Sequence, residues 1–221
     1  MTAYDWQLIQ TGLFETLYMI LISAIFISVF GTLIGFLLYF TNEQNTSKKY
    51  LHVINQIISA FVNIFRSIPF VILIVIMIPV TLILTDGQML GANGALPPLI
   101  VSATPFYARM VYNALLNVPI GRNEALRSLG ASNLKIAHVM LIETLPQLIS
   151  SFTVTLITLI GFISAANAIG GGGLSDQAVI FLIHNGSTKQ LAGYMSVMII
   201  LFIVFFIQIL SDFIVKKINH S

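Results

Sequence analysis

Long apolar runs separated by short polar segments dominate the sequence. Five of these runs reach the roughly 20 residues that a helix needs to cross a lipid bilayer. They are continuous and do not alternate with a period of two, which favours helices over the strands of a membrane barrel. The pattern predicts an all-α integral membrane protein with one transmembrane domain over 1–221 and five spans, at 14–40, 53–84, 96–116, 145–168 and 194–215.

The second run is longer than one crossing requires. We expect its start, 53–61, to lie along the membrane interface, and Pro69 and Pro79 to bend the remainder of the run. The segment before the first run lacks the basic residues of a secretory signal, so the first run is expected to be a retained span.

Composition agrees with lipid as the surrounding solvent. Hydrophobic residues make up 57% of the chain and charged residues only 8%, against about a quarter in soluble domains. The chain has no cysteine, which excludes disulfides and thiolate chemistry. No metal site and no nucleic-acid partner are expected, because the four histidines are scattered without ligand spacing: His52, His138, His184 and His220.

The placement of the charges predicts the orientation in the membrane. Seven basic residues follow spans one, three and five, namely Lys48, Lys49, Arg122, Arg127, Lys135, Lys216 and Lys217. The opposite loops contain Asp86, Asp176 and a single base, Lys189. The positive-inside rule therefore places the N-terminus outside and the C-terminus in the cytoplasm.

The cytoplasmic segment 118–143 is too polar to cross the membrane, yet it is patterned like a short helix. Ala125, Leu126 and Leu129 form a small apolar face, and Gly130 is expected to end the helix in a left-handed conformation. A second helix is expected to start near Ser132 and to lead into span four. Pattern alone leaves two interpretations open, an interfacial helix that covers the bundle and a docking element for a cytoplasmic partner.

Glu124, Ala125 and Gly130 have the spacing Glu-Ala-x-x-x-x-Gly, which resembles the EAA loop of binding-protein-dependent importer permeases. The family usually continues with Ile-x-Leu-Pro, whereas this chain has Leu145-Pro146 slightly later than that register. The resemblance implies a coupling helix that docks on an ATPase subunit. It assigns this role to Arg122, Glu124, Ala125, Leu126, Arg127, Leu129, Gly130 and Ala131.

Three further stretches resemble the methionine branch of these permeases. They are 63–70 with 77–79, 105–116, and 155–161 with 171–174. The resemblance implies the permease subunit of a bacterial importer for methionine, L- and also D-methionine. The implied partners are a second copy of the chain, two cytoplasmic ABC ATPases and an extracytoplasmic methionine-binding protein. ATP and Mg would be bound by the ATPase, with no cofactor on this chain and no catalysis by it. The implied location is the bacterial cytoplasmic membrane.

Arg66 and Arg109 are the only basic residues inside the predicted spans. A charge at mid-bilayer costs several kcal/mol unless it is paired or reaches the interface. Either these side chains anchor helices at the interface, or they contact a neighbouring helix or the coupling loop. We group Arg66 with Phe65, Ser67 and Pro69 as candidates for helix packing or gating, and Arg109 joins them.

Span four carries a polar stripe that continues in an aromatic ring: Ser151, Thr155, Thr158 and Phe162. The hydroxyls lie on one helical face and either bond to their own backbone or line a translocation path at a dimer axis. Beyond this span, Gly171 and Gly172 belong to a run too rich in glycine to be helical. That run is either a plain turn, or an outer gate or receptor contact.

Two other classes of protein are alternatives to the importer subunit. An intramembrane enzyme would need polar groups that converge in the membrane, whereas Glu143 lies at the entrance of a span. An ATP-independent channel is disfavoured by the coupling loop. A permease for another amino acid is the remaining alternative, because related permeases use similar frames.

Overall fold

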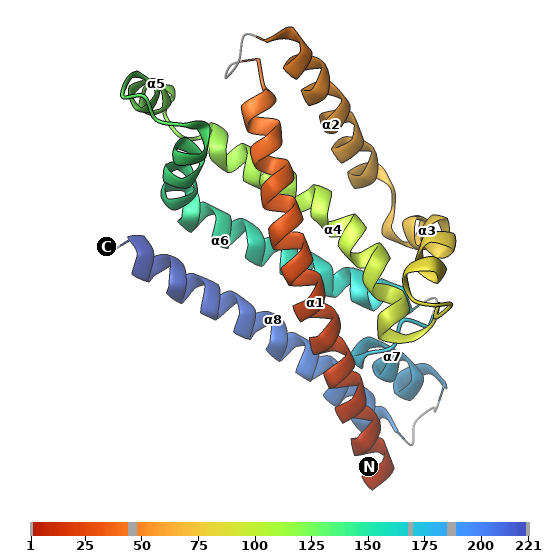
Figure 1. Ribbon diagram of the computed structural model, residues 1–221. Helices are drawn as coiled ribbons and strands as arrows, with labels where there is room; N and C mark the ends of the chain where they lie inside the picture. Colours follow the sequence, from red (N-terminus) through yellow and green to blue (C-terminus); the bar gives the residue numbers. More distant parts are fainter. Residues whose placement is uncertain (1, 44–47, 168–169, 185–188, 220–221) are drawn as a thin grey trace.

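The computed structural model describes residues 2–43, 48–167, 170–184 and 189–219, and nearly all of them are helical (Figure 1). This confirms the all-α prediction. The helices are α1 (Ala3–Thr41), α2 (Lys49–Ser67), α3 (Phe70–Leu84), α4 (Gly91–Leu116), α5 (Ile120–Ser128), α6 (Asn133–Ala166), α7 (Leu174–Val179) and α8 (Gln190–Asn219). A π-helical segment, Ile180–His184, continues α7.

Three of the described helices, α1, α6 and α8, are long and apolar enough to cross a membrane on their own. Helices α2 and α3 are long and apolar enough to cross a membrane only when they are taken together as one broken segment, which is bent by 113°. Helix α4 has 26 residues, but it carries three prolines and several polar side chains. It is not among the helices that are apolar enough to cross a membrane. The five predicted spans remain a prediction, and residue 168 at the end of the fourth lies outside the described residues.

The predicted second span is divided at Ile68 and Pro69. Proline has no amide hydrogen and disfavours helical geometry in the residue before it, so α2 ends at Ser67 and Pro69 becomes the N-cap of α3. Pro79 lies inside α3, which does not end there. The expected location of 53–61 along the membrane interface stays a prediction, and that stretch is the middle of a continuous α2.

Helix α4 lies at the centre of the bundle and packs against α1, α2, α3 and α6. Gly31 and Gly35 of α1 face it at a spacing of four, so that the two backbones approach closely. An added Cβ on Gly35 would lie 2.6 Å from the Val111 side chain and 2.9 Å from the carbonyl oxygen of Ala108. Small residues at this spacing permit close packing of membrane helices, which lack a hydrophobic force between them in lipid.

The segment after α6 forms α7, which the sequence pattern did not predict. Leu174 and Phe181 are completely buried and pack with Ile9 of α1 and Ala192 of α8 in a second, smaller core. This core joins the beginning of α1 to the beginning of α8, where α7 lies in Figure 1.

An ion pair links the N-terminal turn of the chain to the start of α8. Lys189 Nζ lies 2.8 Å from Asp5 Oδ1. The hydrogen bond from Lys189 and those from Thr2 lower the pKa of Asp5 to about 2, so this carboxyl is ionised at neutral pH. Helix α1 has 39 residues and is therefore about 58 Å long, well beyond a hydrocarbon core of about 30 Å. Its first turn therefore lies outside the core.

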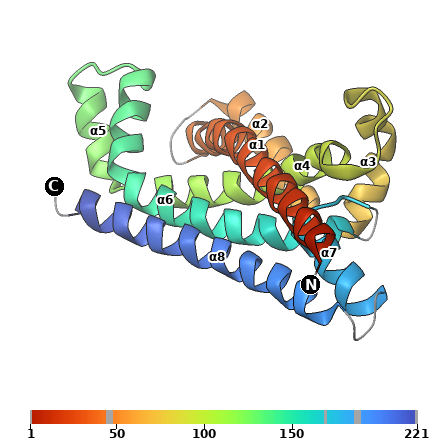
Figure 2. The same ribbon diagram turned by 90° about the horizontal axis from the view of Figure 1, so that it is seen from below.

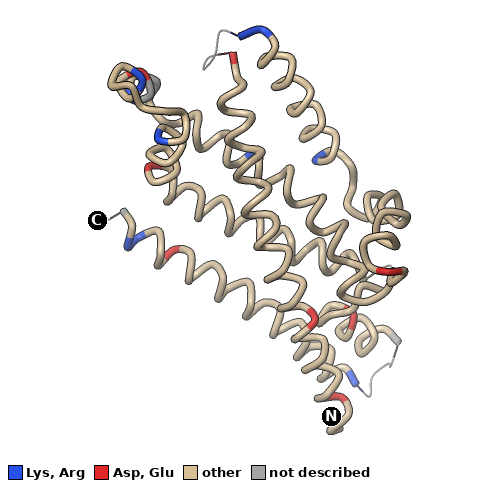
Figure 3. The backbone as a smooth tube through the Cα atoms, in the orientation of Figure 1, with Lys and Arg blue, Asp and Glu red and all other residues tan. Residues whose placement is uncertain are grey.

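The opposite end of the molecule is where most basic residues gather (Figure 3). The start of α2, helix α5, the start of α6 and the last turn of α8 carry them. Figure 2 shows that the first part of α6 stands across the rest of that helix, so α5 and the start of α6 project from the bundle at this end. Pro146 lies inside α6 and accounts for the bend.

Candidate functional site

The projecting α5–α6 hairpin, residues 118–143, is the main candidate site. Helix α5 ends as predicted at Gly130, which has φ of 76°. The Gly130 amide donates to the Arg127 carbonyl and the Ala131 amide to the Leu126 carbonyl, which is the Schellman arrangement that needs a left-handed residue. Ser132 then caps α6 by accepting from the Lys135 amide. The helix expected to start near Ser132 is therefore continuous with the predicted span four.

Most residues with a predicted coupling role are presented on the outside of the hairpin. Leu126 and Ala131 are half-buried and anchor it to the bundle core. The others are exposed: Arg122, Glu124, Ala125, Arg127, Leu129 and Gly130. Leu129 and Leu134 are 83% and 84% exposed, at the tip of a charged element that projects away from the apolar helices. Exposed apolar side chains rimmed by charge are typical of a protein-binding surface.

Arg122 and Glu143 form an ion pair between α5 and α6, although 21 residues separate them in sequence. The Arg122 side chain is 58% exposed and that of Glu143 26%. Arg122 therefore makes a contact between the two arms of the hairpin that the sequence did not indicate.

Replacing Arg122 with alanine is expected to lower ATP-driven uptake by about two- to fivefold, because an exposed ion pair is worth about 0.5–1 kcal/mol. Uptake by the reconstituted transporter measures this. The charge-exchanged double variant Arg122→Glu with Glu143→Arg should recover most of the loss. A double variant as defective as the single one would mean that Arg122 acts on another partner.

The polar stripe of span four lies partly inside the chain. Thr155 is fully buried and donates to the Ser151 carbonyl at 2.8 Å, while half-buried Thr158 donates to the Val154 carbonyl at 2.9 Å. Phe162 stacks on Phe70 of α3, with ring centroids 4.7 Å apart. The hydroxyls of both threonines are thus satisfied by their own backbone, and Phe162 lines a hollow. A path along the stripe stays a prediction.

The two arginines of the predicted spans have different surroundings. Arg109 lies over the ring of Tyr112 on its own helix, 4.8 Å from the centroid. Arg66 lies over Phe106 of the neighbouring α4, 5.8 Å from the centroid. Arg66 therefore makes the interhelical contact that was one of the two alternatives, and it lines a hollow together with Phe65, Ser67, Pro69 and Phe162.

Glycine is required at the turn before α7, because α1 approaches it closely. Gly172 and Gly173 have φ of 73° and 89°. A Cβ on Gly172 would lie 2.7 Å from the carboxylate of Glu15, and one on Gly171 2.9 Å from Ala166. The Glu15 carboxylate accepts from the Gly173 amide at 2.7 Å, and Thr16 Oγ1 accepts from the Leu174 amide at 2.9 Å. The turn is held by α1 and is not a loose connection.

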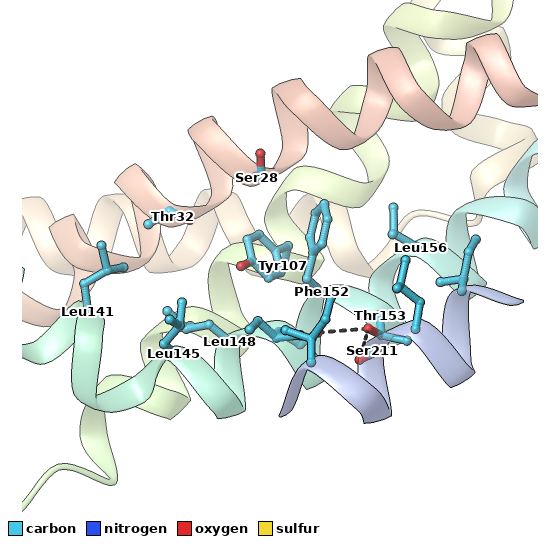
Figure 4. A pocket seen from close by; sticks show the side chains of 14 residues that line it. Ser28, Thr32, Tyr107, Leu141, Leu145, Leu148, Phe152, Thr153, Leu156 and Ser211 are labelled. Carbon is cyan, nitrogen blue, oxygen red and sulfur yellow. Dashed lines mark hydrogen bonds between the residues drawn. The ribbon is translucent and has the colours of Figure 1, made fainter. Parts of the chain in front are cut away.

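A cavity of 480 Å³ lies between α1, α4, α6 and α8 (Figure 4). Its lining is mainly aliphatic, with a few hydroxyls such as Ser28 and Thr32, and the described residues around it include no charged side chain. Thr153 on α6 donates to Ser211 on α8 at 2.6 Å at its edge. The described lining of the cavity offers no basic side chain to the carboxylate of an amino acid.

The sequence did not identify four of the residues described above. They are the exposed Leu134, Glu143 as the partner of Arg122, and Ser102 and Phe106 in the hollow beside Arg66. Leu134 had a usable signal, since an apolar residue just after a helix cap in a polar segment is unusual. The other three had none, because their roles depend on contacts between helices.

The fold defines an integral membrane protein with several apolar helices and a polar hairpin that projects from the bundle. Residues 31–220 match the family described as binding-protein-dependent transport system inner membrane component. The chain belongs to this family.

Three relatives match between 75% and all of the chain. It is 38% identical over 221 residues, all of both chains, to the probable D-methionine transport system permease protein MetI of Pasteurella multocida. It is 43% identical to the methionine import system permease protein MetP of Bacillus subtilis, over 93% of this chain and 91% of that one. It is 46% identical to the Escherichia coli D-methionine permease MetI, over 75% of this chain and 73% of that one.

Solved structures agree. A chain of the inward-facing MetNI methionine ABC transporter superposes with a TM-score of 0.90 at 38% identity, with 99% of each chain covered. A chain of an amino acid ABC transporter with histidines has a TM-score of 0.67 at 19% identity, over 96% of this chain and 94% of that one, and shares the fold alone.

Proposed function

We propose that this chain is the transmembrane permease subunit of an ATP-driven importer for methionine, in its L- and D-forms. The observation that supports this proposal most strongly is the match over nearly the full length to methionine permeases, with a TM-score of 0.90 to the MetNI chain. The chain itself hydrolyses nothing, and ATP and Mg belong to a separate ATPase subunit.

In this proposal the transporter contains two copies of the chain, two cytoplasmic ABC ATPases and an extracytoplasmic methionine-binding protein. The α5–α6 hairpin docks on the ATPase through Glu124, Arg127 and the exposed Leu129 and Leu134. The N-terminus lies outside and the C-terminus in the cytoplasm. The basic residues that gather at the hairpin end support this orientation.

Coupling in this proposal depends on the continuity of one helix. ATP binding draws the two ATPases together, the hairpins move with them, and α6 transmits the motion because it is continuous from the hairpin into the bundle. The bundle tips from inward-open to outward-open, the receptor delivers its ligand, and hydrolysis resets the cycle.

The test is uptake of radiolabelled methionine by the complex reconstituted in vesicles with its ATPase and receptor. We expect uptake that requires hydrolysable ATP and is competed by methionine but not by other amino acids. Flux without ATP would favour a channel. ATP-driven uptake of another amino acid, with none of methionine, would leave the importer role and overturn the substrate.

A further inference from the structure

The break between α2 and α3 forms one side of a hollow of 270 Å³. Helix α2 supplies Arg66 and Ser67, α4 supplies Ser102 and Phe106, and α6 supplies Phe162. The hollow thus lies where three segments distant in sequence meet, and it includes residues predicted separately as gating and path residues.

Arg66 brings a positive charge into this hollow. The described residues form three ion pairs, and none of the three includes Arg66. No carboxylate among these residues lies within ion-pair distance of its guanidinium. Its contact is the face of Phe106, which leaves the guanidinium N–H groups available. Arg66 is exposed in the single chain, and an ionisable residue within a predicted membrane segment marks a candidate functional site. Its positive charge favours an anion as the ligand.

Two further groups beside the hollow are hydrogen-bond donors. Ser102 lines it and is only 7% exposed as a residue, and its hydroxyl has no hydrogen-bond partner among the described residues. The 15-residue α3 begins at its wall, where Pro69 provides no side-chain cap and the first turn contains no acid. The first amides of a helix lack intrahelical acceptors and favour negative charge. In membrane transporters, broken helices present such ends to anionic groups of substrates.

The remaining wall is aromatic. Phe65, Phe106 and the stacked pair Phe70 and Phe162 surround the polar groups. Thioethers make favourable contacts with aromatic rings. A guanidinium and two donors beside an aromatic wall match an amino acid that has a carboxylate at one end and an apolar side chain at the other.

We propose that this hollow is a transit site for the transported amino acid, in which Arg66, the Ser102 hydroxyl and the N-terminus of α3 bind its α-carboxylate. The inference rests on the proposed function and adds a substrate contact inside the membrane subunit. The aromatic wall then accommodates the side chain of methionine.

The experiment uses the permease–ATPase complex in lipid nanodiscs without receptor, labelled with photo-methionine, which has a diazirine in the side chain and an intact carboxylate. We expect labelled peptides that contain Phe65, Phe106 or Phe162. L-Methionine should compete about tenfold better than L-methioninol, which lacks the carboxylate, since a charge-assisted contact typically changes affinity by this factor.

Arg66→Gln should lower labelling of these peptides about tenfold, and Arg66→Lys less, because lysine keeps the charge but not the planar fork. Lys49→Gln removes a charge at the far end of α2 and should leave labelling unchanged. Ser102→Ala keeps Arg66 in place, so it decides the case if Arg66→Gln does not copurify with the ATPase. We expect it to lower labelling about threefold, by loss of one hydrogen bond.

Equal labelling of wild type and Arg66→Gln, or equal competition by methioninol, would overturn the transit site. Wild-type complex that imports methionine without labelling in the hollow would overturn this inference alone. Absence of methionine uptake by the wild-type complex would instead overturn the proposed function.

Discussion

Replacing Gly130 with valine is expected to lower ATP-driven methionine uptake about tenfold or more. Gly130 has φ of 76°, which a β-branched residue adopts only with strain of about 1–3 kcal/mol. A strain of about 1.4 kcal/mol already reduces the population of the native hairpin turn tenfold. Nothing lies within 4 Å of an added Cβ, so the effect is conformational and not a clash. Initial uptake rates and ATP hydrolysis by the same vesicles measure it.

The matched control is Gly130→Asn, because asparagine tolerates the left-handed region best among the other residues. It should keep most of the uptake, while Gly130→Ala falls between the two. Copurification of the ATPase separates a displaced hairpin from an unfolded permease. Equal uptake by the valine and asparagine variants would contradict a role for this backbone conformation in coupling.

Replacing Gly35 with alanine is expected to destabilise the permease strongly, although one methyl group is a small change. Its Cβ would lie 2.6 Å from two atoms of Val111 and 2.9 Å from the Ala108 carbonyl oxygen, which belongs to the backbone of α4 and cannot rotate away. Overpacking of this kind costs about 1–3 kcal/mol. The midpoint temperature of thermal unfolding should fall by about 5 °C or more. It is measured on the purified complex in detergent.

Gly161→Ala is the control for Gly35→Ala. Gly161 also lies within a helix, α6, but nothing approaches within 4 Å of its added Cβ. Alanine has the higher helix propensity, so stability should be equal or higher by up to about 1 kcal/mol. A Gly35→Ala variant as stable as Gly161→Ala would show that α1 and α4 do not cross as closely as described.

Local signals predicted the elements well because they act within a few residues. Gly130 ends α5 and Ser132 caps α6, since glycine tolerates positive φ and serine accepts from a helix amide wherever the fold places them. The apolar runs predicted the membrane helices for a similar reason. Pro69 identified a bend in the second run, but neighbouring helices determined its 113° angle.

Local signals in the sequence did not predict the contacts between helices. In lipid, an apolar helix gains nothing from burying one apolar face over another, so hydrophobic periodicity does not predict which helices meet. The Glu15 carboxylate meets the Gly173 amide across 158 residues, and α7 is held there by a core that no periodic pattern indicated.

The sequence by itself determined the all-α membrane class, the hairpin with Glu124 and Gly130, and the family resemblance, because each depends on composition or on short spacings. Only the tertiary structure decided that Arg122 pairs with Glu143 and that Arg66, Ser102 and Phe162 share one hollow. The physical reason is that close packing of side chains from separate helices depends on the shape of every surface at once, and no single helix carries that information.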